Sequence, residues 1–240
     1  MWNTTAVTSI LTRTEHVDVA DGSFELRVWS PGEPAPAVLV LQEIFGVGEY
    51  IEAVCVRLAE AGYIAAAPDL FWRFAPGWRA DHDEAGLQAS FEQVGRFDFA
   101  QGTTDAVAAL IALGDLPDVA GRPGVLGFCL GGTIAWAVAA AGDPSCCVSY
   151  YGSGVPGMLG LAGDVRCPVL FHFGDEDGYI PAEGIEAVNE LIGTHSNLAL
   201  NVEIAGHAFD NHLAAMFHQP AAAASAWAKT LAFLERSLPR

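Results

Sequence analysis

The chain has 240 residues, of which 52% are apolar and 17% are charged, so it can bury a large hydrophobic core. Its 11 lysine and arginine residues against 29 aspartates and glutamates give a formal net charge of −18 at pH 7. A charge of this sign repels phosphate backbones and anionic lipids, which argues against nucleic acids and membranes as partners. Lys229 is the only lysine, which excludes a P-loop and leaves one peripheral residue for a Schiff base.

The first residues lack the basic start and the apolar block of a signal peptide. The longest apolar run, Ile134 to Ala141, is far shorter than the roughly 18 residues of a membrane span. The five cysteines are scattered without a Cys-x-x-Cys pair, and the histidines lack metal-binding spacing. The sequence therefore predicts a cytoplasmic protein with reduced thiols and with neither a metal nor another cofactor.

Along the chain, segments 14–20 and 23–30 alternate in polarity around Asp21-Gly22, a turn typical of a β-hairpin. Short apolar runs and helical patterns then alternate, which predicts βαβ units and a mostly parallel sheet with helices on both faces. The hairpin adds antiparallel strands at one edge. Because no repeat or long linker divides the chain, we predict a single domain over residues 1–240. The predicted strands are 37–42, 63–67, 123–128, 146–151, 168–173 and 197–204, and the predicted helices are 51–59, 106–113, 133–141, 182–192 and 221–238.

The strand at 123–128 runs into Gly127-Phe128-Cys129-Leu130-Gly131 and then a helix. This is the Gly-x-nucleophile-x-Gly spacing of a nucleophile elbow, with cysteine in the place of serine. The glycines leave room for a sharp turn, and the helix N-terminus favours a thiolate at Cys129. A buried cysteine in a glycine-rich turn is the alternative interpretation.

Two later strand ends favour catalysis. The acidic turn Asp175-Glu176-Asp177 follows the strand at 168–173, and His207 follows the strand at 197–204. Nucleophile, acid and histidine therefore come in the chain order of α/β-hydrolases, each after a strand. A thiol needs a base, and the base needs an orienting carboxylate. The sequence alone does not choose among the three carboxylates.

From about residue 13 to the C-terminus, the chain resembles the dienelactone hydrolase (carboxymethylenebutenolidase) family of α/β-hydrolases. The resemblance rests on Gln42-Glu43-Ile44-Phe45-Gly46, Pro68-Asp69-Leu70, the Cys129 elbow, Tyr150-Tyr151-Gly152, the turn at 174–181 and Ala205-Gly206-His207. It implies an α/β-hydrolase fold and a Cys-Asp-His triad.

Carried over to this chain, the resemblance implies that Cys129 is the nucleophile, His207 the base and Asp177 the acid. It further implies that Glu43 takes the thiol proton when substrate binds. A carboxylate near the thiol raises the thiol pKa, which fits a nucleophile that is protected at rest. The oxyanion hole of this fold uses the N–H of the residue after the nucleophile, Leu130, and the match gives Ile44 as the second donor.

The chain departs from the family at the positions that would bind the substrate carboxylate. The resemblance implies that Arg73 holds a substrate carboxylate, and the adjacent Trp72 and the nearby Trp78 are candidate substrate contacts. A second family arginine falls on Asn211, which has no charge and follows Asp210. An anionic lactone is therefore expected to be held more weakly here.

Three functions follow as hypotheses. The first is a cofactor-free hydrolase of small enol lactones or esters, of the type that converts dienelactone to maleylacetate. The second is a general carboxylesterase or thioesterase for neutral acyl groups, which Asn211 favours. The third is a catalytically silent thiol-sensing or binding protein. The expected partner is a small lactone or ester, and the expected assembly is a monomer or small homo-oligomer.

Overall fold

The computed structural model describes residues 9–238. Residues 1–8, part of the segment that lacks the features of a signal peptide, lie outside the described residues. Within the described part, an eight-stranded sheet has the order β1-β2-β4-β3-β5-β6-β7-β8. Strands β3 to β8 run parallel to one another, whereas β2 pairs antiparallel with both β1 and β4. The strands are β1 (Leu11–Val19), β2 (Gly22–Ser30), β3 (Ala37–Leu41), β4 (Ile64–Pro68), β5 (Gly124–Phe128), β6 (Cys147–Tyr150), β7 (Val169–Gly174) and β8 (Leu198–Glu203).

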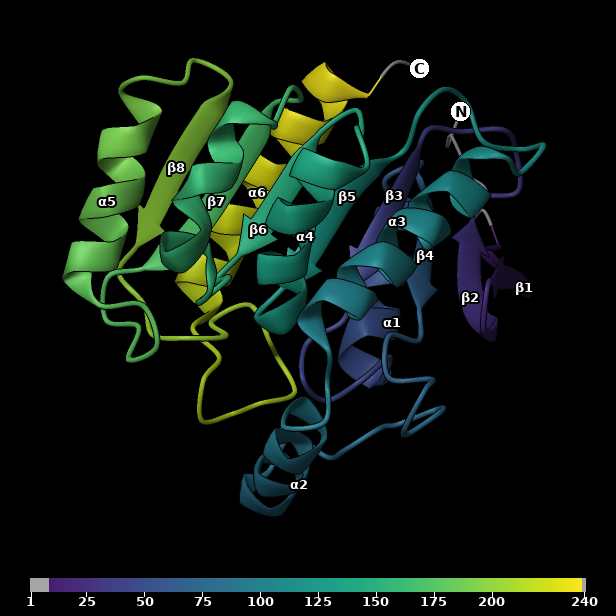
Figure 1. Ribbon diagram of the computed structural model, residues 1–240, viewed down its shortest axis with the longest axis horizontal. Coiled ribbons are helices and arrows are strands. Elements are labelled where there is room, and N and C mark those ends of the chain that lie inside the picture. The colour runs from purple at the N-terminus through teal and green to yellow at the C-terminus, as the bar shows by residue number, and fades with distance from the viewer. Residues whose placement is uncertain (1–8, 239–240) are drawn as a thin grey trace, which may run out of the picture.

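Helices cover both faces of this sheet (Figure 1). In the view of Figure 1, α3, α4 and α5 lie in front of the strands and α6 lies behind them. The guanidinium of Arg57 on α1 stacks over the ring of Trp227 on α6 at 3.7 Å, so α1 and α6 adjoin. The predicted α/β-hydrolase architecture is confirmed. The helices are α1 (Glu49–Glu60), α2 (Glu84–Val94), α3 (Phe99–Gly114), α4 (Leu130–Ala141), the 3₁₀ segment η1 (Val155–Gly163), α5 (Ala182–Ile192) and α6 (Pro220–Ser237).

The central strands consist mostly of apolar residues. Every residue of β3, β4, β5, β6 and β7 is buried, because helices cover both sides of these strands. Edge strand β1 instead alternates between exposed and less exposed residues. No helix within residues 9–238 is long and apolar enough to cross a membrane.

The hairpin forms as predicted, but its turn lies one residue earlier than the sequence indicated. Val19 pairs with Gly22, so Ala20 and Asp21 form the turn and Gly22 already belongs to β2. A Cβ atom at Gly22 would lie 2.7 Å from the Trp72 ring. Glycine is therefore needed here for close packing rather than for the turn.

Helix α2 was not predicted from the sequence. Asp83 caps its N-terminus by accepting a hydrogen bond from the backbone N–H of Gly86. The helix projects beyond the carboxyl ends of the strands (Figure 1). Leu87, Phe91 and Val94 follow each other at helical spacing on one face, a signal that could have identified the helix.

Candidate active site

Cys129 occupies a sharp turn between β5 and α4. Its φ of 54° lies in the left-handed region, which non-glycine residues adopt at a cost in strain. A Cβ at Gly127 would lie 2.0 Å from the carbonyl oxygen of Gly131, and a Cβ at Gly131 would lie 2.3 Å from that of Leu41. The flanking glycines are therefore required by backbone contacts, and together they hold the cysteine at the N-terminus of α4.

An acid and a histidine from two neighbouring strand ends meet beside this turn. His207 follows β8, and its Nδ1 lies 2.8 Å from Oδ2 of Asp177, which follows β7. The second carboxylate oxygen of Asp177 accepts from the backbone N–H of Tyr179 at 2.8 Å. Asp177 is buried, whereas Asp175 and Glu176 are exposed. Of the three carboxylates of this turn, Asp177 is the one that bonds the imidazole.

The imidazole of His207 favours its protonated form. Burial by itself lowers the pKa of His207, but the negative charge of a Cys129 thiolate and the hydrogen bond to Asp177 outweigh it and raise that pKa to about 10. A protonated imidazole beside the sulfur can balance the charge of a thiolate while that thiolate attacks a carbonyl carbon.

Glu43 follows β3 and is 2% exposed. Its Oε1 lies 2.8 Å from Nε2 of His82 and accepts the Nδ2 amide of Asn211 at 2.9 Å. Sequence reasoning placed Asn211 at the substrate and gave His82 no role. In the structure both side chains bind Glu43, and neither lines the substrate cavity.

Two backbone N–H groups are available for an oxyanion. Ile44 and Leu130 both line the cavity next to Cys129. Within residues 9–238, neither N–H donates a hydrogen bond to another group. Such unpaired donors can bind the oxygen of a tetrahedral intermediate.

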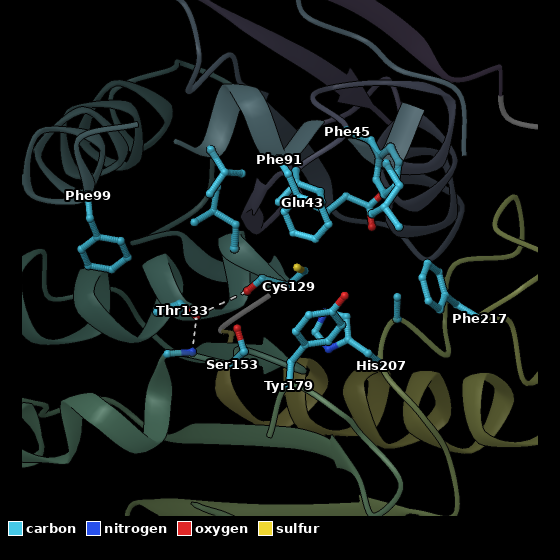
Figure 2. Close-up of a pocket in the computed structure, with 16 residues that line it drawn as sticks. Glu43, Phe45, Phe91, Phe99, Cys129, Thr133, Ser153, Tyr179, His207 and Phe217 are labelled. Carbon is cyan, nitrogen blue, oxygen red and sulfur yellow. Dashed lines mark hydrogen bonds between the residues drawn. The ribbon is translucent and has the colours of Figure 1, made fainter. Parts of the chain in front are cut away.

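Cys129, His207 and Glu43 all line one cavity of about 270 Å³, which has a mainly apolar wall (Figure 2). Figure 2 shows Cys129 between Glu43 and His207, with aromatic rings around them. None of the lining residues is a lysine or an arginine. The lining residues are Glu43, Ile44, Phe45, Leu87, Phe91, Val94, Phe99, Cys129, Leu130, Thr133, Ser153, Gly154, Tyr179, His207, Ala208 and Phe217.

The predicted substrate contacts of the 72–79 loop lie elsewhere. Arg73 forms ion pairs with Asp105 and Asp21, and Trp72 donates its indole N–H to Asp105 at 3.0 Å. Trp78 lines a different, small cavity. The structure therefore does not bring these residues to Cys129, because the hairpin and α3 hold the first two.

Sequence reasoning missed the wall that α2 contributes. Leu87, Phe91 and Val94 all face the cavity.

Among residues 9–238, no group of three or more histidine, cysteine, aspartate or glutamate side chains could hold a metal ion.

Comparison with known proteins identifies the family of the chain. The chain matches the model of the dienelactone hydrolase family over residues 24–238. It is 35% identical over 205 residues to a carboxymethylenebutenolidase of Pseudomonas sp. strain P51, covering 85% of this chain and 86% of that protein. A carboxymethylenebutenolidase of Pseudomonas putida is 36% identical over 204 residues, with 83% and 86% covered.

Solved structures share the fold. A dienelactone hydrolase-like promiscuous phosphotriesterase from metagenomic libraries superposes with a TM-score of 0.82 at 24% identity, covering 96% of this chain and all of the other. The dienelactone hydrolase of Anabaena variabilis gives a TM-score of 0.71 at 18% identity, with 96% and 99% covered. The family model and the sequence relatives show that the chain belongs to the dienelactone hydrolase family and is a hydrolase of carboxylic esters and lactones.

Proposed function

We propose that this enzyme cleaves small, uncharged esters and enol lactones through a thiol ester on Cys129. The observation that carries the proposal is the convergence of Cys129 and the Asp177–His207 pair on an apolar cavity without a lysine or arginine in its wall. An anionic substrate would enter this cavity beside the Glu43 carboxylate and find no lysine or arginine side chain to bind it.

In the acylation step, the Cys129 sulfur attacks the carbonyl carbon and a C–S bond forms. The N–H groups of Ile44 and Leu130 bind the oxyanion. When the tetrahedral intermediate collapses, its C–O bond breaks, and the leaving oxygen takes a proton from the His207 imidazolium. Enols and phenols are good leaving groups, so enol lactones and aryl esters suit this step.

In the deacylation step, His207 takes a proton from water, and the resulting hydroxide attacks the thiol ester. The acid leaves and the Cys129 thiolate returns. Acylation removes the thiolate charge, which is a main cause of the raised His207 pKa. The imidazole is therefore a better base in the acyl-enzyme than while Cys129 is a thiolate, and Asp177 keeps its Nδ1–H oriented.

Glu43 is proposed to receive the thiol proton of Cys129 when substrate enters. Both groups line the same cavity, and Glu43 is buried. Before that transfer, the carboxylate charge disfavours a thiolate, which protects the resting cysteine from oxidation.

The proposal is tested with a neutral aryl ester and Cys129→Ala. Turnover should be lost while the melting temperature stays close to that of the wild type. Mass spectrometry of the wild type, quenched during turnover, should find the acyl group on Cys129. A variant with unchanged turnover, or an acyl group on another residue, overturns the proposal.

Dienelactone itself is the second candidate substrate, since the Pseudomonas relatives are carboxymethylenebutenolidases at 35–36% identity. The ultraviolet absorbance of dienelactone reports its hydrolysis directly. If its kcat/KM exceeds that of neutral esters, the anionic lactone is the preferred substrate; a lower value favours neutral acyl groups.

A further inference from the structure

His82 connects the active-site carboxylate to a second cavity. Its Nε2 lies 2.8 Å from Glu43 Oε1, and its side chain is only 8% exposed. His82 also lines a cavity of about 430 Å³ that shares no lining residue with the substrate cavity. The wall of this second cavity includes the exposed residues Glu49, Arg79 and Asp81, so the cavity contacts solvent. The Glu43–His82 pair therefore spans from the substrate cavity to solvent.

Neighbouring groups fix the geometry of the pair. The Oδ1 atom of Asn211 accepts the backbone N–H groups of Leu213 and Ala214, which turns the amide nitrogen toward Glu43. The His82 ring packs on Phe45 with centroids 4.4 Å apart. Both donors reach Oε1 of Glu43, and Oε2 accepts no hydrogen bond from residues 9–238. Oε2 is thus the oxygen open to a proton from the substrate cavity.

We propose that His82 is a positioning residue that exchanges protons between Glu43 and solvent without passage through the substrate cavity. This inference rests on the proposed function, in which Glu43 receives the thiol proton. In the proposed step, Glu43 is a carboxylate and His82 carries a proton on both ring nitrogens before the transfer. The Cys129 proton moves to Oε2 of Glu43, and the Nδ1 proton of His82 leaves to solvent. The pair ends as a carboxylic acid and a neutral imidazole whose Nε2–H still donates to Oε1.

This exchange keeps the buried pair at zero net charge before and after the step. An unbalanced charge at a site as buried as Glu43 would be costly. A substrate in the apolar cavity would displace water from it, and His82 then gives Glu43 a path to solvent that the substrate does not block. The other titratable or charged groups near His82 are Tyr50, whose ring centroid is 6.4 Å away, His212, Glu49, Arg79 and Asp81.

His82→Gln tests the proposal, because a glutamine amide can donate to Glu43 but cannot exchange a proton near neutral pH. With a neutral aryl ester, kcat should fall at least about tenfold while KM stays within about twofold, since His82 does not touch substrate. The pH profile of kcat should lose one ionisation. His212→Gln is the matched control, because it removes a nearby imidazole that does not bond Glu43, and it should retain the wild-type profile.

A second variant, His82→Ala, opens space beside the solvent-facing cavity. Added imidazole should restore part of its kcat, which a purely structural role for His82 would not produce. In the background of Glu43→Gln, His82→Gln should have no further effect on kcat, because both act in one proton path.

Two results overturn the inference. If Glu43→Gln is slow but His82→Gln keeps the wild-type kcat and pH profile, protons leave Glu43 by another route. If His82→Ala is slow and imidazole restores nothing, His82 acts only structurally. Either result leaves the proposed hydrolase intact, which fails if Cys129→Ala remains active or if the acyl group is found on another residue.

Discussion

The guanidinium of Arg73 binds the carboxylate of Asp105 in a two-pronged geometry, with Nη2 2.9 Å from Oδ1 and Nε 3.1 Å from Oδ2. Asp105 is 1% exposed, and Arg73 also pairs with Asp21 in the hairpin turn. The arginine therefore neutralises a buried carboxylate of α3 and ties the hairpin to that helix.

From this pairing we predict that Arg73→Ala lowers the free energy of unfolding by about 1–3 kcal/mol, because Asp105 loses its cation. The KM for a neutral ester should stay within about twofold of the wild type, since Arg73 does not line the cavity. Urea unfolding and steady-state kinetics measure the two effects. Arg166→Ala, at an exposed position, is the control for stability. A large rise in KM with unchanged stability would contradict the prediction.

Asp177→Asn should lower kcat by about 10³- to 10⁴-fold, because an amide cannot stabilise the imidazolium and can favour the wrong tautomer of His207. It should also lower the pKa of His207, since the hydrogen bond to Asp177 raises that pKa. Kinetics and histidine NMR check the two parts. Asp175→Asn and Glu176→Gln, from the same turn, should retain activity. A severe loss in either control would assign the acid role to another carboxylate.

His172 gives a pH dependence of stability that is separate from catalysis. Burial lowers its pKa to about 3, and its ring is fixed between Asn201 and Thr230. In the unfolded chain this histidine has a pKa near 6.5, so between about pH 6.5 and pH 3 the unfolded chain binds a proton that the folded chain does not bind. This part of the stability is therefore fully present above about pH 6.5 and is lost as the pH falls toward 3.

At pH 5 the loss from His172 should be about 2 kcal/mol relative to neutral pH. His172→Gln should reduce the acid sensitivity by that amount, whereas His16→Gln, at an exposed position, should not. Urea unfolding of the three proteins at the two pH values measures the difference. Equal acid sensitivity in the wild type and His172→Gln would show that other groups cause it.

The features that could be predicted from the sequence are those that depend on local chain geometry. Buried strands, the elbow around Cys129 and the residues after strand ends depend on local chain geometry, so short motifs indicate them. The partners of Arg73 and Asn211 depend on contacts 32 and 168 residues away along the chain. A family match at Arg73 could indicate the residue but not its partner Asp105. Helix α2 was missed because its apolar face is short and covers the cavity rather than the sheet.

The apolar wall from α2 predicts how charge selectivity can be changed. Leu87 faces the cavity, whereas its neighbour Gln88 is exposed. Leu87→Arg would add a cation to the wall, so kcat/KM for an ester that carries a carboxylate should rise relative to an uncharged ester of the same size. One charge-assisted contact corresponds to a change of about tenfold or more in that ratio.

Gln88→Arg is the matched control for Leu87→Arg, because it adds the same charge to the same helix outside the cavity. It should leave the ratio of the two kcat/KM values unchanged at moderate salt, where the field of an exposed charge is screened. An equal change in both variants would mean that general attraction to a chain of net charge −18 controls selectivity. A change confined to Leu87→Arg assigns the charge selectivity to the cavity wall itself.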